Sequence, residues 1–263
     1  MTPYLLAALA AVAAASFLIS PRVRTLDGFF RGFDETGKAP SLLTLTLSQV
    51  TTWIFARSLM NAAILGYYYG IAGALAYAAY YLSFLTGGVI VDQLRFRHHV
   101  SSVQEFLSSH YGAMGRWSYN LVIGVRLLSE VFANLLVVGI IFGAAGTTTY
   151  TVAIVAIAVL TLAYSMMGGL RASLRTDVLQ TVILYVGLAA LLILTLAQPD
   201  FHFVPVLTSS PDPGGPGWVL LAVAVLQIWS YPLHDPVMMD RGFLADRETT
   251  RKSFLHAAWI SIV

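Results

Sequence analysis

Long apolar runs separated by short polar segments set the pattern of this sequence. The pattern predicts helical spans at about residues 3–20, 42–66, 71–94, 115–143, 150–167, 176–197, 217–239 and 253–263. A helix that crosses a bilayer needs about 20 mostly apolar residues, so we expect the last span to be incomplete. We therefore predict an all-α, polytopic membrane protein with a single transmembrane domain over residues 1–263, truncated within its last helix.

Polar residues interrupt two of these spans. Within residues 44–70 the middle of the span carries Ser48, Gln49, Thr51 and Thr52. Each polar group in hydrocarbon costs about 1–3 kcal/mol or more unless it is paired. This pattern indicates either a broken helix that lines a binding site or a helix whose polar groups bond to neighbours. In residues 217–239, Pro232 and Pro236 remove backbone donors and should break the helix.

Composition agrees with a membrane protein and excludes other classes. Hydrophobic residues make up 57% of the chain and charged residues 11%, with a mean hydropathy of +0.74. Soluble domains carry about 25% charged residues. The chain contains no cysteine, which excludes disulfides, thiolate metal sites and a cysteine nucleophile. We expect the lipid bilayer as its environment and no nucleic-acid partner.

Cations are distributed unevenly between the two sides of the predicted helices. If the N-terminus lies outside, 13 of the 15 Lys and Arg residues fall on inner loops or inner helix ends. They are Arg22, Arg24, Arg31, Lys38, Arg95, Arg97, Arg116, Arg171, Arg175, Arg241, Arg247, Arg251 and Lys252. Because cytoplasmic loops are enriched in Lys and Arg, we predict an integral protein of the cell (inner) membrane with its N-terminus outside.

Charged residues within the spans are candidates for function. Arg126 and Glu130 are spaced i,i+4, so they lie on one helix face and can form a self-contained pair. Arg57 has no such neighbour. We expect a carboxylate to neutralise it, from Glu130, Asp235 or Asp177. Otherwise Arg57 binds a substrate carboxylate in bidentate fashion, or it replaces a bound cation and gives a carrier that needs no sodium.

One motif stands between the fifth and sixth spans. The segment YSMMGGLRASLRTDVLQ contains Gly168, Gly169, Leu170, Thr176, Asp177 and Gln180. It resembles the most recognisable motif of the sodium:solute symporter family. The segments DGFFRGF, LSQVTTWIFARSLMN, SVQEFLSSHYG and DRGFLADRETTRKS are similar to other parts of that family, although Asp240 replaces its usual Gln. The resemblance implies a leucine-transporter-like fold, with a leading helix, a first five-helix inverted repeat and the start of the second.

The resemblance also implies sites for an ion and for its exit. The coupling ion would be Na+, bound by the backbone carbonyls of Thr51 and Ile54, and no organic cofactor is expected. Alternatively, the threonines of this helix bond to their own backbone. Asp177 would lie at the cytoplasmic end of the ion pathway, or would pair with Arg171 or Arg175 in the turn. A metal site other than one for Na+ is not expected.

Substrate residues are implied at the two interrupted spans. They would be Trp53, Phe55, Ser58, Gln227, Tyr231 and His234. Tyr231 falls where sugar symporters of the family have a gating tyrosine, or it packs against Pro232 with its hydroxyl bonded inside the bundle. Together these features predict Na+-coupled symport of a small polar solute, an amino acid, sugar or carboxylate, by alternating access. They do not predict an enzyme.

Two further functions stay open from the sequence. A symporter-like sensory or regulatory membrane module would share these helices. The chain would otherwise be a non-functional fragment of a longer carrier. Since the second repeat is mostly missing, we expect residues 1–263 to need a continuation or a partner polypeptide before they transport.

Overall fold

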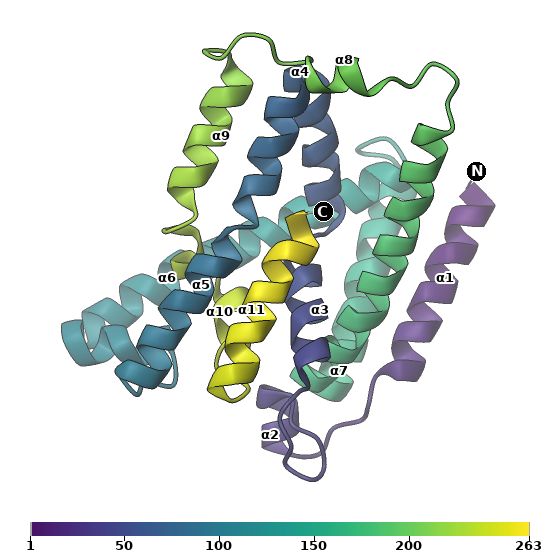
Figure 1. Cartoon of the computed structure of the whole chain (residues 1–263). Coiled ribbons are helices and arrows are strands. Elements are labelled where there is room, and N and C mark those ends of the chain that lie inside the picture. The colour runs from purple at the N-terminus through teal and green to yellow at the C-terminus, as the bar shows by residue number, and fades with distance from the viewer. Residues whose placement is uncertain (1, 263) are drawn as a thin grey trace.

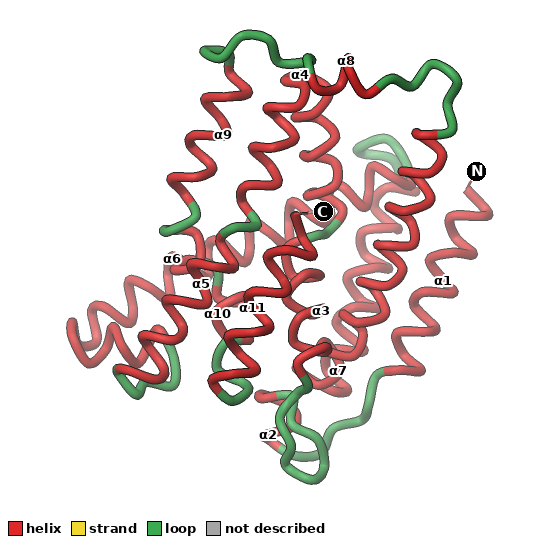
Figure 2. Tube along the Cα trace, in the orientation of Figure 1, coloured by secondary structure: helices red, strands yellow, loops and turns green. Residues whose placement is uncertain are grey.

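The computed structural model describes residues 2–262, and within this range every regular element is a helix (Figures 1 and 2). The helices are α1 (Thr2–Ile19), α2 (Leu26–Arg31), α3 (Leu42–Trp53), α4 (Ala56–Tyr80), α5 (Ser83–Asp92), a π-helical turn η1 (Gln93–Arg97), α6 (Val103–Phe142), α7 (Thr148–Leu196), α8 (Phe203–Leu207), α9 (Pro216–Gln227), a 3₁₀ turn η2 (Tyr231–His234), α10 (Pro236–Arg241) and α11 (Arg247–Ile262). The predicted all-α fold is confirmed.

Three helical segments are long and apolar enough to cross a membrane. They are Ala56–Arg97, Val103–Phe142 and Thr148–Leu196, and two shorter apolar helices cover Tyr4–Ile19 and Pro216–Gln227. This confirms the expectation of a polytopic membrane protein, because several spans of this kind cannot be covered within one small bundle. The division into inverted repeats stays a prediction.

Glycines turn two of the long helices, α7 and α4, back on themselves. Gly169, with φ 52° and ψ −140°, divides α7 into two segments, and Gly70, with φ 60° and ψ −147°, divides α4. These angles lie in a region that favours glycine. At Gly169 a Cβ atom would also lie 2.4 Å from the carbonyl O of Phe29. Both turns coincide with the predicted boundaries between spans.

A loop on the far side of the bundle from α2 fastens the turn at Gly70. Ser209 Oγ accepts a hydrogen bond from the backbone N of Ile71 at 2.8 Å. Ser210 Oγ accepts one from Ala72 N at 3.0 Å and donates one to the carbonyl O of Tyr69 at 2.6 Å. The two serines therefore replace backbone bonds that the helix loses at the glycine.

The core lies where both interrupted helices meet. Helix α3 packs between α7 and α11, and α4 packs along α9 (Figure 1). The main cluster of buried apolar side chains includes Val50, Trp53, Phe84, Met238 and Phe254. These residues come from α3, α5, α10 and α11, so the core holds the ends of α3 and α10 next to each other.

Candidate functional site

The first helix break separates α3 from α4. Ile54 leaves the helix with φ −106° and ψ 91°, and Phe55 is extended with φ −125° and ψ 177°. Ser58 bridges the gap, because its Oγ donates to the carbonyl O of Trp53 at 2.7 Å. Among the described residues, no hydrogen bond is formed to the carbonyl of Thr51 or of Ile54. The two predicted Na+ ligands therefore have free oxygens.

The threonines of α3 bond to their own helix, as one of the two predictions for them states. Thr52 Oγ1 donates to the carbonyl O of Ser48 at 2.7 Å. Thr51 Oγ1 lies 3.0 Å from the carbonyl O of Leu47 and also 3.0 Å from that of Asp177. The Thr51 hydroxyl thus joins α3 to α7, while its own carbonyl stays free.

The second helix break separates α9 from α10. Helix α9 ends at Gln227, and Pro236 occupies the first turn of α10. Asp235 has φ −106° and ψ 91°, the same angles as Ile54, and its Oδ1 accepts a hydrogen bond from Met238 N at 3.0 Å. The prolines break this span as the sequence predicts, and Asp235 caps the helix that follows.

A cavity of about 490 Å³ lies between the two breaks. Of the six predicted substrate residues, Trp53, Phe55, Ser58, Gln227 and Tyr231 line it. The rings of Trp53 and Tyr231 are 4.5 Å apart between centroids, which brings the two breaks into contact. His234 does not line the cavity, and its ring packs 4.9 Å from that of Tyr231.

Part of the cavity wall was not among the predicted substrate residues. Asn61 and Ser129 line it, together with Tyr77 and Tyr80 at the end of α4 and Tyr81, which follows α4. The tyrosines lie in a predicted span that has no polar cluster. Their spacing places them on one helix face, because residues three and four apart are neighbours on a helix, but it does not show whether that face meets a core or a cavity.

Arg126 is the centre of the charges in the cavity wall. Its Nη2 lies 2.7 Å from Glu130 Oε1, 2.7 Å from the hydroxyl of Tyr231 and 3.4 Å from Asp235 Oδ2. Its guanidinium also lies 4.6 Å from the ring centroid of Tyr231. The predicted Arg126–Glu130 pair forms, but it is not self-contained, because it binds α6 to the second break.

Arg57 differs from the expectation that a carboxylate neutralises it. It lines the cavity and is exposed, and among the described residues no carboxylate oxygen lies within 4.0 Å of it. Two of the three expected partners, Glu130 and Asp235, bind Arg126 instead. The third, Asp177, binds Arg241. An unpaired guanidinium therefore faces the cavity.

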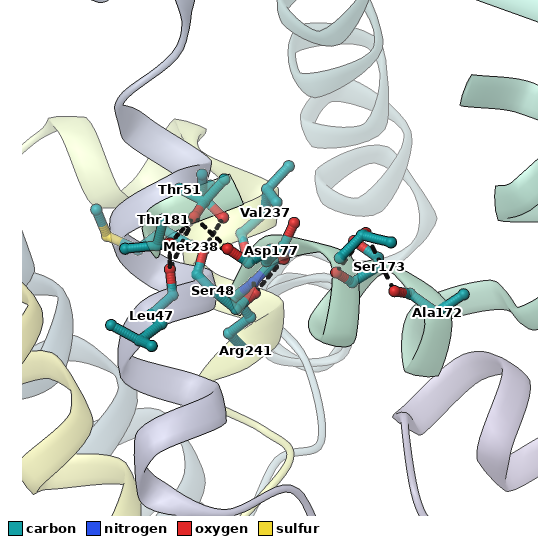
Figure 3. A network of polar contacts seen from close by, with 12 residues as sticks. Leu47, Ser48, Thr51, Ala172, Ser173, Asp177, Thr181, Val237, Met238 and Arg241 are labelled. Carbon is teal, nitrogen blue, oxygen red and sulfur yellow. Dashed lines mark hydrogen bonds and ion pairs between the residues drawn. The ribbon is translucent and has the colours of Figure 1, made fainter. Parts of the chain in front are cut away.

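A buried polar network joins α3, α7 and α10 (Figure 3). Asp177 is 9% exposed, and its Oδ2 accepts hydrogen bonds from Ser48 Oγ and, at 3.1 Å, from Arg241 Nη2. Arg241 Nε also lies 2.6 Å from Ser48 Oγ. One ion pair thus connects α3, α7 and α10, and neither charge is left alone in the core.

The prediction that Asp177 pairs with Arg171 or Arg175 is wrong. Arg171 Nη1 lies 3.8 Å from Glu35 Oε1, and Arg175 is exposed. After the turn at Gly169 the chain is helical, and residues two or six positions apart point to different sides of a helix, so Asp177 faces α3 and α10 while Arg171 and Arg175 do not. Arg241 was overlooked because it follows an apolar stretch at the edge of a predicted loop.

A second cavity, of about 1090 Å³, opens beside α2 and reaches this network. Arg241 and Ser173 line its inner end, and Asp240 lines its wall. Asp240 is accessible from this cavity yet surrounded by protein, and the partial loss of solvent raises the pKa of its carboxyl to about 6. Arg241 of the buried pair therefore faces this second cavity.

A model of the sodium:solute symporter family matches residues 37–199, which is more than half of the 263 residues. No curated protein and no solved structure matches the chain. The matched range contains the first break, Arg126 and Asp177, whereas the second break and Arg241 lie beyond it.

Proposed function

Because the chain belongs to the sodium:solute symporter family, we propose that it moves a small polar solute bearing a carboxylate across the membrane together with Na+. Transport would proceed by alternating access. The family couples Na+ to solute movement and consists of transporters, and the long apolar helices place this chain in a lipid bilayer. We propose the orientation with the N-terminus outside, which the cation distribution supports.

The observation that carries this proposal is the pair of helix breaks on one cavity. Irregular backbone at membrane depth is stable only inside protein or beside a water-filled cavity. Secondary transporters bind ions and substrates at such interrupted helices. Here the breaks at Ile54 and Asp235 face a cavity of about 490 Å³ that contains five of the residues expected for a substrate.

The free carbonyls of the first break support a site for Na+. A hard cation binds oxygen ligands, and the carbonyl oxygens of Thr51 and Ile54 have no hydrogen-bond partner among the described residues. Two oxygens are fewer than the six or so that a hard cation takes. The proposed site therefore requires further ligands besides these two residues.

Arg57 supports a carboxylate on the solute. A charged side chain within a membrane-spanning bundle faces the bundle interior or a water-filled cavity and marks a candidate substrate pathway. A guanidinium binds a carboxylate through two parallel hydrogen bonds. Since Arg57 lines the cavity and no carboxylate oxygen of the described residues lies within 4.0 Å of it, a carboxylate on the solute would satisfy it.

The buried ion pair supports a closed exit on the side of α2. Asp177 would attract Na+ at this end of the pathway, and weak binding would allow its release. In the structure Arg241 forms an ion pair with Asp177, so the Asp177 carboxylate could bind Na+ only after this pair separates. Opening of this exit would therefore require α10 to move away from α3 and α7.

Cysteine protection tests the proposal, because the chain has no cysteine of its own. Ile64→Cys places a thiol in the cavity wall, and Thr36→Cys places one in an exposed loop as the control. In nanodiscs, Na+ together with a carboxylate solute should slow maleimide labelling at residue 64 and not at residue 36. Proline, pantothenate and acetate would be compared with glucose, with K+ replacing Na+ in parallel samples.

If neither Na+ nor any of the four solutes changes the rate of maleimide labelling at residue 64, the proposal is refuted. Uptake into proteoliposomes under a Na+ gradient then separates two functions. Binding with uptake supports a carrier, whereas Na+-dependent binding without uptake supports either the sensory module or a chain that needs a continuation or a partner polypeptide to transport.

A further inference from the structure

A groove of about 790 Å³ lies between α5 and α11, which pack side by side in opposite directions (Figure 1). The end of α5 meets the start of α11, because Arg247 Nε and Nη2 donate to the two carboxylate oxygens of Asp92 at 2.6 Å and 2.7 Å. Further along both helices Gly88 faces Phe254, and a Cβ atom on Gly88 would lie 3.1 Å from Phe254 Cβ. The ion pair and the glycine therefore hold the two helices at the floor of the groove.

The groove is charged at one end and apolar along the rest of its length. The charged end is lined by Asp92, Arg247, Glu248 and Arg251, and the apolar part by Leu85, Gly88, Val89, Phe254 and Leu255. From Leu85 to Asp92 the helix rises by about 10 Å. Val89 and Leu255 are 52% and 43% exposed. Since α5 belongs to a segment that is long and apolar enough to cross a membrane, the apolar part opens toward lipid and the charged end lies near the bilayer surface.

Cations exceed carboxylates at the charged end of the groove. Residues 92–97 and 246–252 carry five Lys or Arg and three Asp or Glu residues, a net charge of +2. Arg247 is paired with Asp92, and Lys252 with Glu248. Arg251 lines the groove, is exposed, and has no carboxylate oxygen within 4.0 Å among the described residues. Its guanidinium is therefore available to an anion.

Two arginines behind the groove add to this positive field. Arg95 Nη1 donates to the carbonyl O of Gly242 at 2.9 Å, and Arg97 Nη1 donates to Gln93 Oε1 at 3.2 Å. In the described part of the chain neither forms an ion pair. Basic pockets between membrane helices on the cytoplasmic side bind anionic lipid headgroups, and each Lys or Arg near the surface contributes to the attraction.

The shape of the groove selects a lipid over other anions. A free phosphate would use only the end at Arg251 and leave the apolar part uncovered. A partner helix would cover the apolar part, but it would leave Arg251 uncompensated unless it carried an acidic residue at that level. A phospholipid places its phosphate at the bilayer surface and its acyl chains toward the middle, which is the order in which the groove changes from charged to apolar.

We propose that the groove between α5 and α11 binds an anionic phospholipid of the inner leaflet, with its phosphate on Arg251 and an acyl chain along Leu85, Val89 and Leu255. The leaflet follows from the proposed orientation, whereas the site itself does not depend on transport. The lipid supports the core from outside, because α11 packs on α3: Gln49 Nε2 donates to Ser253 Oγ at 3.4 Å.

Quenching of a fluorophore in the groove tests the inference, because the chain has no cysteine of its own. Val89→Cys, labelled with bimane, places the fluorophore on the apolar part. Phosphatidylglycerol and phosphatidylcholine with the same brominated acyl chains would each be titrated into phosphatidylcholine nanodiscs that contain the whole chain. Brominated phosphatidylglycerol should quench at about fivefold lower mole fraction than brominated phosphatidylcholine.

Leu162→Cys is the matched control for the position of the fluorophore. Leu162 is 60% exposed, lies about 10 Å along α7 from the turn at Gly169, and lines neither the groove nor the two cavities. The two brominated lipids should quench equally there.

Variants of one cation identify the source of the preference. Arg251→Gln should reduce the preference at residue 89 to about twofold or less, and Arg251→Lys, which keeps the charge, should retain most of it. Arg251 is exposed, so neither variant disturbs the core. Arg175→Gln is the matched control, because Arg175 is an exposed cation on the same predicted side that does not line the groove. It should leave the preference unchanged.

Each contrary outcome removes a defined part of the inference. Equal quenching by the two lipids at residue 89 overturns the anionic headgroup. A preference that survives Arg251→Gln overturns the role of Arg251. A preference that disappears when free glycerol phosphate is added means that a phosphate binds without its acyl chains. Quenching at residue 162 but not at residue 89 means that a polypeptide, such as a second copy of the chain, covers the groove, and overturns the lipid.

Discussion

Ile54 at the first helix break and Asp235 at the second adopt the same backbone angles, φ −106° and ψ 91°. Their surroundings differ. The first break leaves the carbonyls of Thr51 and Ile54 without a hydrogen bond and Arg57 without an ion pair among the described residues. At the second break, Asp235 caps α10 with one carboxylate oxygen and reaches Arg126 with the other.

The difference shows how one backbone shape serves two purposes. Side chains of the protein satisfy the second break, so it holds its geometry without a ligand. At the first break the carbonyls of Thr51 and Ile54 and the guanidinium of Arg57 have no such partners among the described residues, so they are available to bind ligands. Substitutions at the second break should therefore change stability, and substitutions at the first should change binding.

The largest change in stability is expected at the buried network that joins α10, which follows the second break, to α3, which precedes the first break. Arg241→Gln leaves the Asp177 carboxylate buried without its cation, which should cost about 3–5 kcal/mol of stability. Thermal unfolding in detergent measures the loss. The double variant Arg241→Gln with Asp177→Asn should recover most of it, since no buried charge then remains. Losses that simply add would show that the pair contributes little.

A smaller loss is expected at the second break itself. Asp235→Ala removes the cap of α10 and one partner of Arg126, which should cost about 2–3 kcal/mol, while Glu130 still balances the guanidinium. Asp235→Asn keeps an acceptor for Met238 N and should lose about half as much. Unfolding midpoints of the two variants give the comparison. Equal midpoints would mean that the cap does not stabilise the break.

Arg57→Gln should show the opposite behaviour at the first break. Stability should change by less than about 0.5 kcal/mol, because Arg57 is exposed and makes no ion pair among the described residues. Affinity for a carboxylate solute should fall about 10–100-fold, since a charge-assisted hydrogen bond contributes about 1.5–3 kcal/mol. Unfolding and cysteine protection measure the two quantities. Lost stability with unchanged affinity would reverse the roles of the two breaks.

The smallest effect is expected at Asp240, at the far end of α10. Its pKa of about 6 lies above the ordinary value of 3.8, so the folded chain holds this proton more tightly than the unfolded chain. Stability should fall as the pH rises from 5 to 7.5, and Asp240→Asn should reduce this fall by about 1–2 °C in the unfolding midpoint.

Asp246 is the matched control for this prediction. A hydrogen bond from Thr249 lowers the pKa of its carboxyl, so its stabilising contribution is lost only as the pH falls below its ordinary range. Asp246→Asn should therefore leave the change between pH 5 and 7.5 as it is in the unmodified chain. An equal response of both variants would mean that Asp240 does not hold its proton.

The two helix breaks could be predicted from the sequence more accurately than the ion pairs between helices. Pro232 and Pro236 mark the second break by themselves, because proline lacks the backbone donor. No proline or glycine marks Ile54, and only the polar residues of α3 and the family resemblance located the first break. The turn at Gly169 was also visible as a glycine pair.

Partners across the bundle were not predictable in the same way. Asp177 has two arginines nearby in sequence, yet it binds Arg241, because the helix after Gly169 points it toward α10. Tyr77, Tyr80 and Tyr81 fit an apolar span, so nothing in the sequence separates a cavity wall from a core. Backbone carbonyls carry no sequence signal at all, so the proposed Na+ ligands rest on the position of the break.

Ser209 and Ser210 fasten the turn at Gly70 from a loop that lies far from both breaks in sequence. The segment that begins at this turn carries the tyrosines of the cavity wall, so the anchoring serines set how far that helix is rotated about its axis. A change in this loop would then alter solute preference without changing a residue of the cavity. We expect homologous carriers to diverge in this loop as their solutes diverge, while the cavity residues themselves stay unchanged.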